Sequence, residues 1–204
     1  MDFNPSQLSA IENYRLLIGT IVPRPIAFVS TVSQDGQRNL AAFSFFNGVC
    51  PKPFIVSFAP MRKMGNLEKK DTLLNIEETG EFVINIVSES LVEKMNLTSP
   101  EYDFEVDEFE VAGLTPRPSQ RVKPPGVAES LVHMECRKVD ILHFGDEEGA
   151  GSLVIGEVIF LHVDDSVYDG RHILLETLQP VARLAGDAYA RTTDIFHLPR
   201  PSLK

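Results

Sequence analysis

A cluster of basic side chains lies between an apolar run and the expected start of a helix. Residues 60–72 (PMRKMGNLEKKDT) contain four cations, Arg62, Lys63, Lys69 and Lys70, and within 62–70 only Glu68 opposes them. We expect Asp71 to cap the helix that follows. A helix N-terminus offers free N–H groups and partial positive charge, and nearby cations strengthen its preference for a phosphate. The pattern indicates a phosphate-ester site, with an ordinary solvated basic loop as the alternative.

A second stretch, 39–47 (NLAAFSFFN), alternates small residues with phenylalanines around one serine. Small side chains let a flat ring approach the backbone, whose N–H groups can then bond the polar edge of the ring. Packing within a hydrophobic core is the alternative interpretation. The stretch is therefore a candidate contact for a planar group.

Other common signatures are missing from the chain. No GxxxxGK[ST] motif occurs, and the glycine cluster at 145–151 is acidic and has Val154 where a GxGxxG pattern would need glycine. No HExxH or GxSxG motif occurs, and the five histidines lack short ligand spacing, so we expect structural or surface roles for them. These absences disfavour a Rossmann or P-loop site, a metal enzyme and a triad hydrolase.

Composition bounds the class of protein. The chain has 204 residues, a formal net charge of −10, 43% hydrophobic residues and 24% charged residues. This size fits a single domain over 1–204. The resemblance described below adds the expectation of a C-terminal extension from about 176. The negative charge argues against nucleic acid as a partner. Cys50 and Cys136 have no metal-ligand spacing, so reduced thiols are expected. The absence of a signal pattern and of a long apolar run predicts a soluble, cytoplasmic protein without membrane association.

The elements that must position these residues are mainly strands. Strand patterns cover 26–32, with a tight turn leading into 39–41, and then 54–59, 82–87, 131–144 and 153–163. Helical patterns cover 71–79, 89–96 and 176 to about 184. Because strands and helices do not alternate, this order of elements predicts six strands in a mainly antiparallel sheet or barrel with peripheral helices.

Two loops differ in composition from the rest of the chain. The segment 115–125 (TPRPSQRVKPP) holds four of the fourteen prolines and predicts an extended surface excursion, with a domain linker as the alternative. The segment 101–110 (EYDFEVDEFE) carries six carboxylates and no basic residue. Its alternating Phe104, Val106 and Phe109 predict a solvated acidic face with apolar anchors directed inward.

The chain resembles the flavin reductase-like, FMN-binding split-barrel family. The resemblance rests on motifs in a fixed order: 22–31 (VPRPIAFVST), 35–36, 39–47, 69–72 (KKDT) with Asn75, 80–85 (GEFVIN), 107–109, 112–114, 135–136, 155–158 (IGEV), and 180–184 (PVARL) with Gly186 and Tyr189. It implies a six-stranded antiparallel Greek-key split barrel that forms a homodimer. It also implies one FMN per subunit, near the dimer interface.

The family pattern, carried over residue by residue, implies a set of flavin contacts. Four side chains would lie along the isoalloxazine ring and the ribityl chain: Asn39, Ala41, Phe43 and Ser44. Four would surround the ribityl phosphate, with Asp71 capping the helix beneath it: Ser57, Arg62, Lys70 and Thr72. Two from the C-terminal stretch would approach the ring from its far side: Arg183 and Tyr189.

The chain also departs from the family pattern. Relatives often have a histidine just before the strand at 153–158, where this chain has Gly151 and Ser152, which puts a ring contact there in doubt. Pro53-Phe54 stands where many relatives have two prolines, and Ala42 replaces a frequent proline. The last two differences concern loop stiffness more than chemistry.

The resemblance implies an FMN-dependent oxidoreductase that takes a hydride from NADH or NADPH and passes electrons to an acceptor. That acceptor could be free flavin for a partner monooxygenase, a metal ion or an electron-transfer protein. Because a flavin brings its own redox chemistry, the missing triad and metal cluster are expected. The alternatives are an FMN-binding electron carrier without direct NAD(P)H activity, or a scaffold for another planar cofactor such as pyridoxal phosphate or haem.

Overall fold

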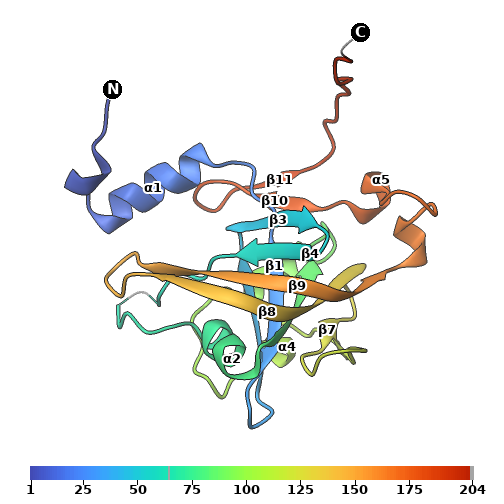
Figure 1. The fold of residues 1–204 in the computed structure, drawn as a ribbon, viewed down its shortest axis with the longest axis horizontal. Coiled ribbons are helices and arrows are strands. Elements are labelled where there is room, and N and C mark those ends of the chain that lie inside the picture. Colours follow the sequence, from blue (N-terminus) through green and yellow to red (C-terminus); the bar gives the residue numbers. More distant parts are fainter. Residues whose placement is uncertain (64, 203–204) are drawn as a thin grey trace.

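A seven-stranded antiparallel sheet is the centre of the fold (Figure 1). The computed structural model describes residues 1–63 and 65–202. The strand order is β2-β1-β5-β8-β9-β4-β3, and every neighbouring pair is antiparallel. The strands span β1 Ala27–Val32, β2 Arg38–Phe43, β3 Phe46–Pro51, β4 Phe54–Phe58, β5 Glu81–Ile86, β8 Val132–Phe144 and β9 Gly151–Val163. The mainly β class predicted from the sequence is thus confirmed.

The sheet has one strand more than the six expected, and the additional strand is β3. Its residues 47–49 are exposed, because β3 lies at the edge of the sheet and pairs only with β4. An exposed edge strand needs no alternating apolar pattern, so the sequence gives little signal there. Two small hairpins complete the β structure: β6 Pro116–Arg117 with β7 Gly126–Val127, and β10 Val181–Arg183 with β11 Tyr189–Arg191.

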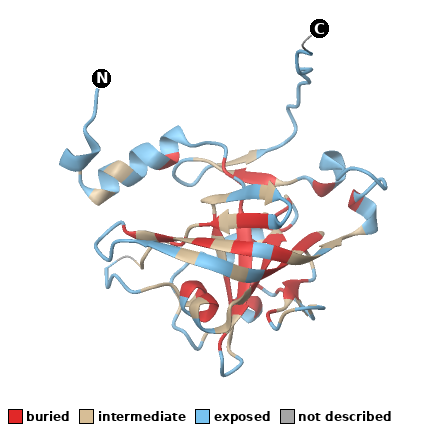
Figure 2. Cartoon of the chain, in the orientation of Figure 1, coloured by how far each residue is buried: buried red, intermediate tan, exposed pale blue. Residues whose placement is uncertain are grey.

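The long hairpin of β8 and β9 joins the two parts of the sheet. It pairs with β5 on one side and with β4 on the other, and it crosses the front of the molecule in Figure 1. Figure 2 shows the buried residues gathered on the strands behind it. Phe58 and Phe82 are fully buried there with an edge-to-face geometry, and their ring centroids are 5.6 Å apart. Gly156 permits this packing, because a Cβ at that position would lie 2.3 Å from Cζ of Phe82.

Short helices surround the sheet. They span α1 Ala10–Thr20, α2 Asp71–Thr79, α3 Val92–Leu97, α4 Glu108–Val111 and α5 Leu175–Leu178, with 3-10 turns η1 Pro5–Gln7 and η2 Asp165–Val167. Helix α1 was not predicted, although Ser9 and Glu12 form a capping box at its start. Only Ile18 of this helix is buried, yet Ile11, Tyr14 and Ile18 recur at helical spacing, so the sequence carries a helical signal that was overlooked.

Two helix predictions need correction. Asp71 is not the N-cap of α2: Lys70 occupies that position, no side chain caps the helix, and Asp71 is its first residue. The helix expected over 176–184 ends instead at Leu178, because Gln179 adopts a left-handed conformation (φ 46°) and Pro180 follows it. The chain then forms β10, whose Arg183 pairs with Arg24.

The predictions for the two compositionally unusual loops are not equally accurate. The segment 115–125 is mostly exposed, as expected of a surface excursion, and the amides of Gln120 and Arg121 attach it to the carboxylate of Glu135 at 2.8 and 2.6 Å. The solvated acidic face expected for 101–110 is only partly correct. Phe109 is buried as expected, whereas Phe104 is exposed, and Glu108 is buried with its carboxylate bonded to Asn39 and Leu40.

Two further expectations concern the thiols and the membrane. Cys50 and Cys136 are both free, and burial raises the pKa of Cys136. Among the described residues, none of the helices has the length and apolar character needed to cross a bilayer.

Candidate functional site

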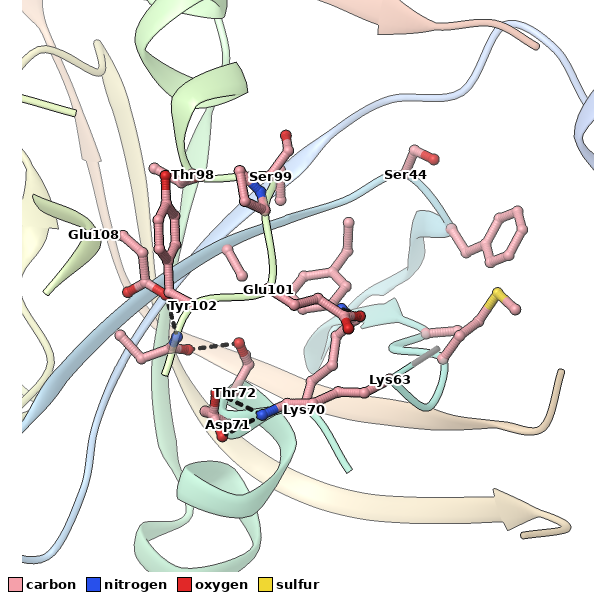
Figure 3. Close-up of a pocket in the computed structure, with 18 of the residues that line it drawn as sticks. Ser44, Lys63, Lys70, Asp71, Thr72, Thr98, Ser99, Glu101, Tyr102 and Glu108 are labelled. Atoms are coloured by element: carbon pink, nitrogen blue, oxygen red, sulfur yellow. Dashed lines mark hydrogen bonds and ion pairs between the residues drawn. The ribbon is translucent and has the colours of Figure 1, made fainter. Parts of the chain in front are cut away.

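A cavity of about 240 Å³ lies where β2, the loop after β4, the start of α2 and the loop 98–102 meet. Figure 3 shows its lining side chains, which converge from these segments. Seven of the residues selected from the sequence line it: Asn39, Ala41, Phe43, Ser44, Lys70, Asp71 and Thr72. The structure therefore brings the small-residue stretch and the basic loop together, although they are well separated in the sequence.

The inner wall of the cavity is a polar network around Asn39, on β2. The carboxylate of Glu108 accepts hydrogen bonds from Nδ2 of Asn39 at 3.0 Å and from the amide of Leu40 at 2.9 Å. On its other side, Oδ1 of Asn39 accepts a hydrogen bond from Oγ1 of Thr72 at 2.6 Å. Because both ends of the Asn39 amide are bonded, its orientation is fixed, and β2, α2 and α4 are tied together behind the cavity.

Glu108 is the buried titratable group of this wall, with 7% of its surface exposed. Burial raises the pKa of its carboxyl above the ordinary value, while the hydrogen bonds from Leu40 and Asn39 act in the opposite direction. The acidic pattern of 101–110 gave no indication that one member of the run is directed into a cavity.

The cationic end of the cavity contains two ion pairs. Nζ of Lys63 lies 3.1 and 3.2 Å from the two carboxylate oxygens of Asp71, and Nζ of Lys70 lies 3.0 Å from Oε1 of Glu101. The first turn of α2, which carries the partial positive charge of a helix N-terminus, lies at the same end. This end can bind an anion if a carboxylate gives up its lysine.

Ser44 continues the wall toward the N-terminal helix through the buried Arg24. The Arg24 guanidinium donates to Oγ of Ser44 at 3.2 Å and to the carbonyl oxygens of Ile18, Ile21 and Leu184 at 2.8, 2.6 and 2.9 Å. Burial lowers the pKa of Arg24, and the carbonyl groups compensate its charge. Arg24, from the PRPIA motif, thus attaches the end of α1 and the strand β10 to β2.

Four selected residues lie outside this cavity. Ser57 is half-buried on β4, opposite Asn47 and Ile155. Arg62 lines an adjoining cavity of about 230 Å³ and donates to the carbonyl oxygen of Leu67 at 2.7 Å. Arg183 and Tyr189 lie together on the β10–β11 hairpin, with the guanidinium carbon 4.5 Å from the centre of the tyrosine ring. One chain alone therefore does not place these four side chains in the main cavity.

Several lining residues were missed from the sequence. Tyr14 comes from the unpredicted α1, and Thr98, Ser99 and Pro100 come from a loop with no motif of its own. Glu101 and Tyr102 begin the acidic segment 101–110, which was expected to be a solvated face. Lys63 belongs to the basic loop, which was recognised in the sequence, but its ion pair with Asp71 is seen only in the structure. The loop residues could be found only from the fold, because α3 directs the chain back across the cavity.

A larger apolar cavity of about 780 Å³ adjoins the first and shares Tyr14, Phe45, Ala59 and Met61 with it. It lies between α1 and the tip of the β8–β9 hairpin and includes Gly151 and Ser152. Oγ of Ser152 lies 2.9 Å from Nδ1 of His143 on the neighbouring strand. A histidine is therefore present beside this position, although it comes from β8.

The chain is similar to a known domain family and to several solved structures. Residues 18–177 match the family model described as the flavin reductase like domain. The structure of nitrilotriacetate monooxygenase component B from Bacillus cereus is 40% identical, covers 97% of this chain and 98% of its own, and superposes with a TM-score of 0.91. The 2-nitrobenzoate 2-nitroreductase of Pseudomonas fluorescens is 30% identical, covers 99% and 97%, and has a TM-score of 0.87.

A third structure bears on the architecture. A protein of Shewanella frigidimarina, described as a flavin reductase with a split barrel domain, is 26% identical, covers 98% of this chain and 100% of its own, and has a TM-score of 0.82. The split-barrel class predicted from the sequence is thereby confirmed, with the additional edge strand noted above.

Proposed function

This chain belongs to the flavin reductase-like family, and from that premise we propose that it is an FMN-binding oxidoreductase. It would take a hydride from NADH or NADPH and pass the electrons to an acceptor. The observation that carries the proposal is the single cavity in which a strand of small residues, at Ala41, ends near two lysines and a helix N-terminus. A flat ring and a phosphate need these two environments at opposite ends of one site.

The donor set of the cavity fits FMN. Lys70, Thr72 and the start of α2 would hold the phosphate, because they combine cations, a hydroxyl and a helix N-terminus. Ala41 and Phe43 would lie along the ring, and Asn39 and Ser44 would offer polar contacts to the ribityl chain and the ring edge. Ser57 and Arg62 lie outside the cavity. Their contact with the phosphate stays a prediction.

Bound FMN would supply the hydride and electron chemistry, so the protein has to bind and orient it. Asn39 is suited to orientation, because Glu108 and Thr72 hold both ends of its amide. Buried Arg24 holds Ser44 and the end of α1 in place. Tyr14 and Phe45 would separate the cavity from solvent on the side of the larger apolar cavity.

We propose that the chain forms a homodimer with the flavin near the interface. Support comes from α1 and its C-cap residue, where Leu16, Leu17 and Ile21 are exposed beside the apolar cavity, and from Phe144 at the hairpin tip, which is 62% exposed. Exposed apolar side chains gathered in one place are typical of protein–protein contacts. Arg183 and Tyr189 would reach the ring only in such an assembly.

The proposed electron acceptor follows from the comparison. The component B relative is named as part of a monooxygenase, so a partner monooxygenase is the first candidate. An electron-transfer protein is the second. The proposed site of action is cytoplasmic.

The decisive experiment is a visible spectrum of the purified protein, before and after incubation with FMN and desalting. Retained flavin absorbance is expected, and a colourless protein after loading would overturn the proposal. Anaerobic addition of NADH or NADPH should then bleach the flavin rapidly. Reduction by dithionite or a partner protein alone would favour the alternative function, an FMN-binding electron carrier without NAD(P)H activity.

A further inference from the structure

Both lysines at the phosphate end of the cavity already have carboxylate partners. Lys63 is paired with Asp71 and Lys70 with Glu101, so the two pairs together carry no net charge. A phosphate dianion entering this end would meet cations whose charge is already compensated. It must therefore compete with a carboxylate for at least one lysine.

The two carboxylates differ in how readily they can be displaced. The side chain of Asp71 is 15% exposed and contacts Lys63 through both oxygens. It also stands in the first turn of α2, where a negative charge is stabilised by the helix dipole. The side chain of Glu101 is 38% exposed, lies in a loop, and contacts Lys70 through one oxygen. Glu101 is thus the partner that an incoming phosphate can displace.

The loop that carries Glu101 is held at both sides of this residue. Oγ1 of Thr98 donates to the carbonyl oxygen of Met95 at 2.9 Å, and Oη of Tyr102 donates to the carbonyl oxygen of Leu97 at 2.9 Å. Pro100 precedes Glu101 and restricts the backbone further. Figure 3 shows Glu101 above Lys70, on the far side of the cavity from α2. Displacement of the carboxylate would therefore need a side-chain rotation, and the loop would return it to Lys70 when the phosphate leaves.

We infer that Glu101 is an internal competitor for the flavin phosphate and makes bound FMN exchangeable. This inference rests on the proposed function, since it concerns the same site. FMN binding requires the Lys70–Glu101 ion pair to open, and FMN release is assisted when it closes. The pair also reduces the preference for FMN over riboflavin, because only the phosphate ester has to compete with it.

The test compares Glu101→Gln with Glu105→Gln, which removes the same charge from the same acidic segment at an exposed position outside the cavity. Dissociation constants for FMN and riboflavin are measured by quenching of flavin fluorescence, and FMN dissociation rates by stopped flow. We expect E101Q to bind FMN about tenfold more tightly and to release it more slowly. Its affinity for riboflavin, and both affinities of E105Q, should stay at the wild-type values.

A double-mutant cycle separates direct competition from a change in the loop. In a Lys70→Ala background, E101Q should bring no gain in FMN affinity, because the contested cation is gone. Glu101→Asp keeps the charge but shortens the side chain, so it should also bind FMN more tightly than wild type does. This variant tests the inference if E101Q folds poorly.

The outcomes separate competition by Glu101 from FMN binding itself. If wild type binds FMN but E101Q binds it equally or more weakly, the inference is overturned while the proposed function stands. An equal gain for riboflavin, or a gain that persists without Lys70, overturns it as well. If neither wild type nor E101Q binds FMN, the proposed function and the inference fail together.

Discussion

The carboxylate of Glu108 accepts the backbone amide of Leu40 at 2.9 Å and thereby joins α4 to the strand that forms one wall of the cavity. The same carboxylate holds Nδ2 of Asn39 at 3.0 Å. Two donors of β2 thus depend on one buried side chain. Burying a donor without a partner is costly, so this carboxylate matters for the wall as a whole.

Glu108→Ala should lower the free energy of unfolding by about 2 kcal/mol, because the amides of Leu40 and Asn39 would lose their acceptor. Urea denaturation measures the change. Glu105→Ala, an exposed change in the same segment, should stay within about 0.5 kcal/mol of wild type. Equal stability of the two variants would show that water replaces the Glu108 carboxylate.

Lys70→Ala should weaken FMN by about tenfold or more while leaving riboflavin almost unaffected, because Lys70 is proposed to contact the flavin only at its phosphate and its loss leaves Glu101 without a cation. Titration of both flavins by fluorescence gives the two ratios. Lys94→Ala, a partly exposed lysine outside the lining, serves as the control for lost positive charge. Equal losses for both flavins would mean that Lys70 acts on the structure of the site instead.

Ala41→Leu should abolish retention of both flavins, since the larger side chain would occupy the space along β2 that the ring needs. The flavin absorbance after desalting is the measurement, with the thermal unfolding midpoint recorded beside it. Ala128→Leu, an exposed position away from the cavity, should retain flavin like wild type. A flavin-bound A41L protein would place the ring elsewhere.

The protein should lose stability as the pH falls from 7.5 to 5.5, because His133 is buried in its neutral form. Burial lowers the pKa of His133 below the ordinary 6.5, and burial together with the Arg117 cation lowers that of His162, which stacks on it. Between the folded and unfolded pKa values the unfolded chain binds more protons, so the free energy of unfolding rises with pH.

Urea denaturation across this pH range tests the assignment. His133→Gln, which keeps a donor for the carbonyl oxygen of Val127, should reduce the slope of stability against pH. His197→Gln, at an exposed position, should leave that slope as it is in wild type. A slope unchanged in H133Q would assign the dependence to other groups.

A helix or strand can be predicted from the sequence when its burial leaves a regular pattern in neighbouring residues. Strands β1, β5 and β9 were predictable because buried β-branched and aromatic runs leave a dense local pattern. Helix α1 was not predicted, although the capping box of Ser9 and Glu12 is a helical signal in the sequence. The basic loop and the small-residue stretch were recognisable as chemistry before the fold was known.

The partners of the site residues were not predictable in the same way. Glu108 looks like its acidic neighbours, yet it is buried and accepts hydrogen bonds from Asn39 and Leu40 on a separate strand. Asp71 has the residue type of a helix cap, yet its carboxylate pairs with Lys63. Asp71 pairs with a residue of the preceding loop instead of capping its own helix. Local helix propensity does not describe such a contact.

The order of the strands also has a consequence for synthesis on the ribosome. The residues that line the cavity lie between Tyr14 and Glu108, whereas β8 and β9, which join β5 to β4, are translated only afterwards. A nascent chain that has emerged as far as α4 carries the lining without the hairpin that holds both ends of the sheet together. We therefore expect the proposed flavin to bind in the last stage of folding, when the C-terminal third of the chain has left the exit tunnel.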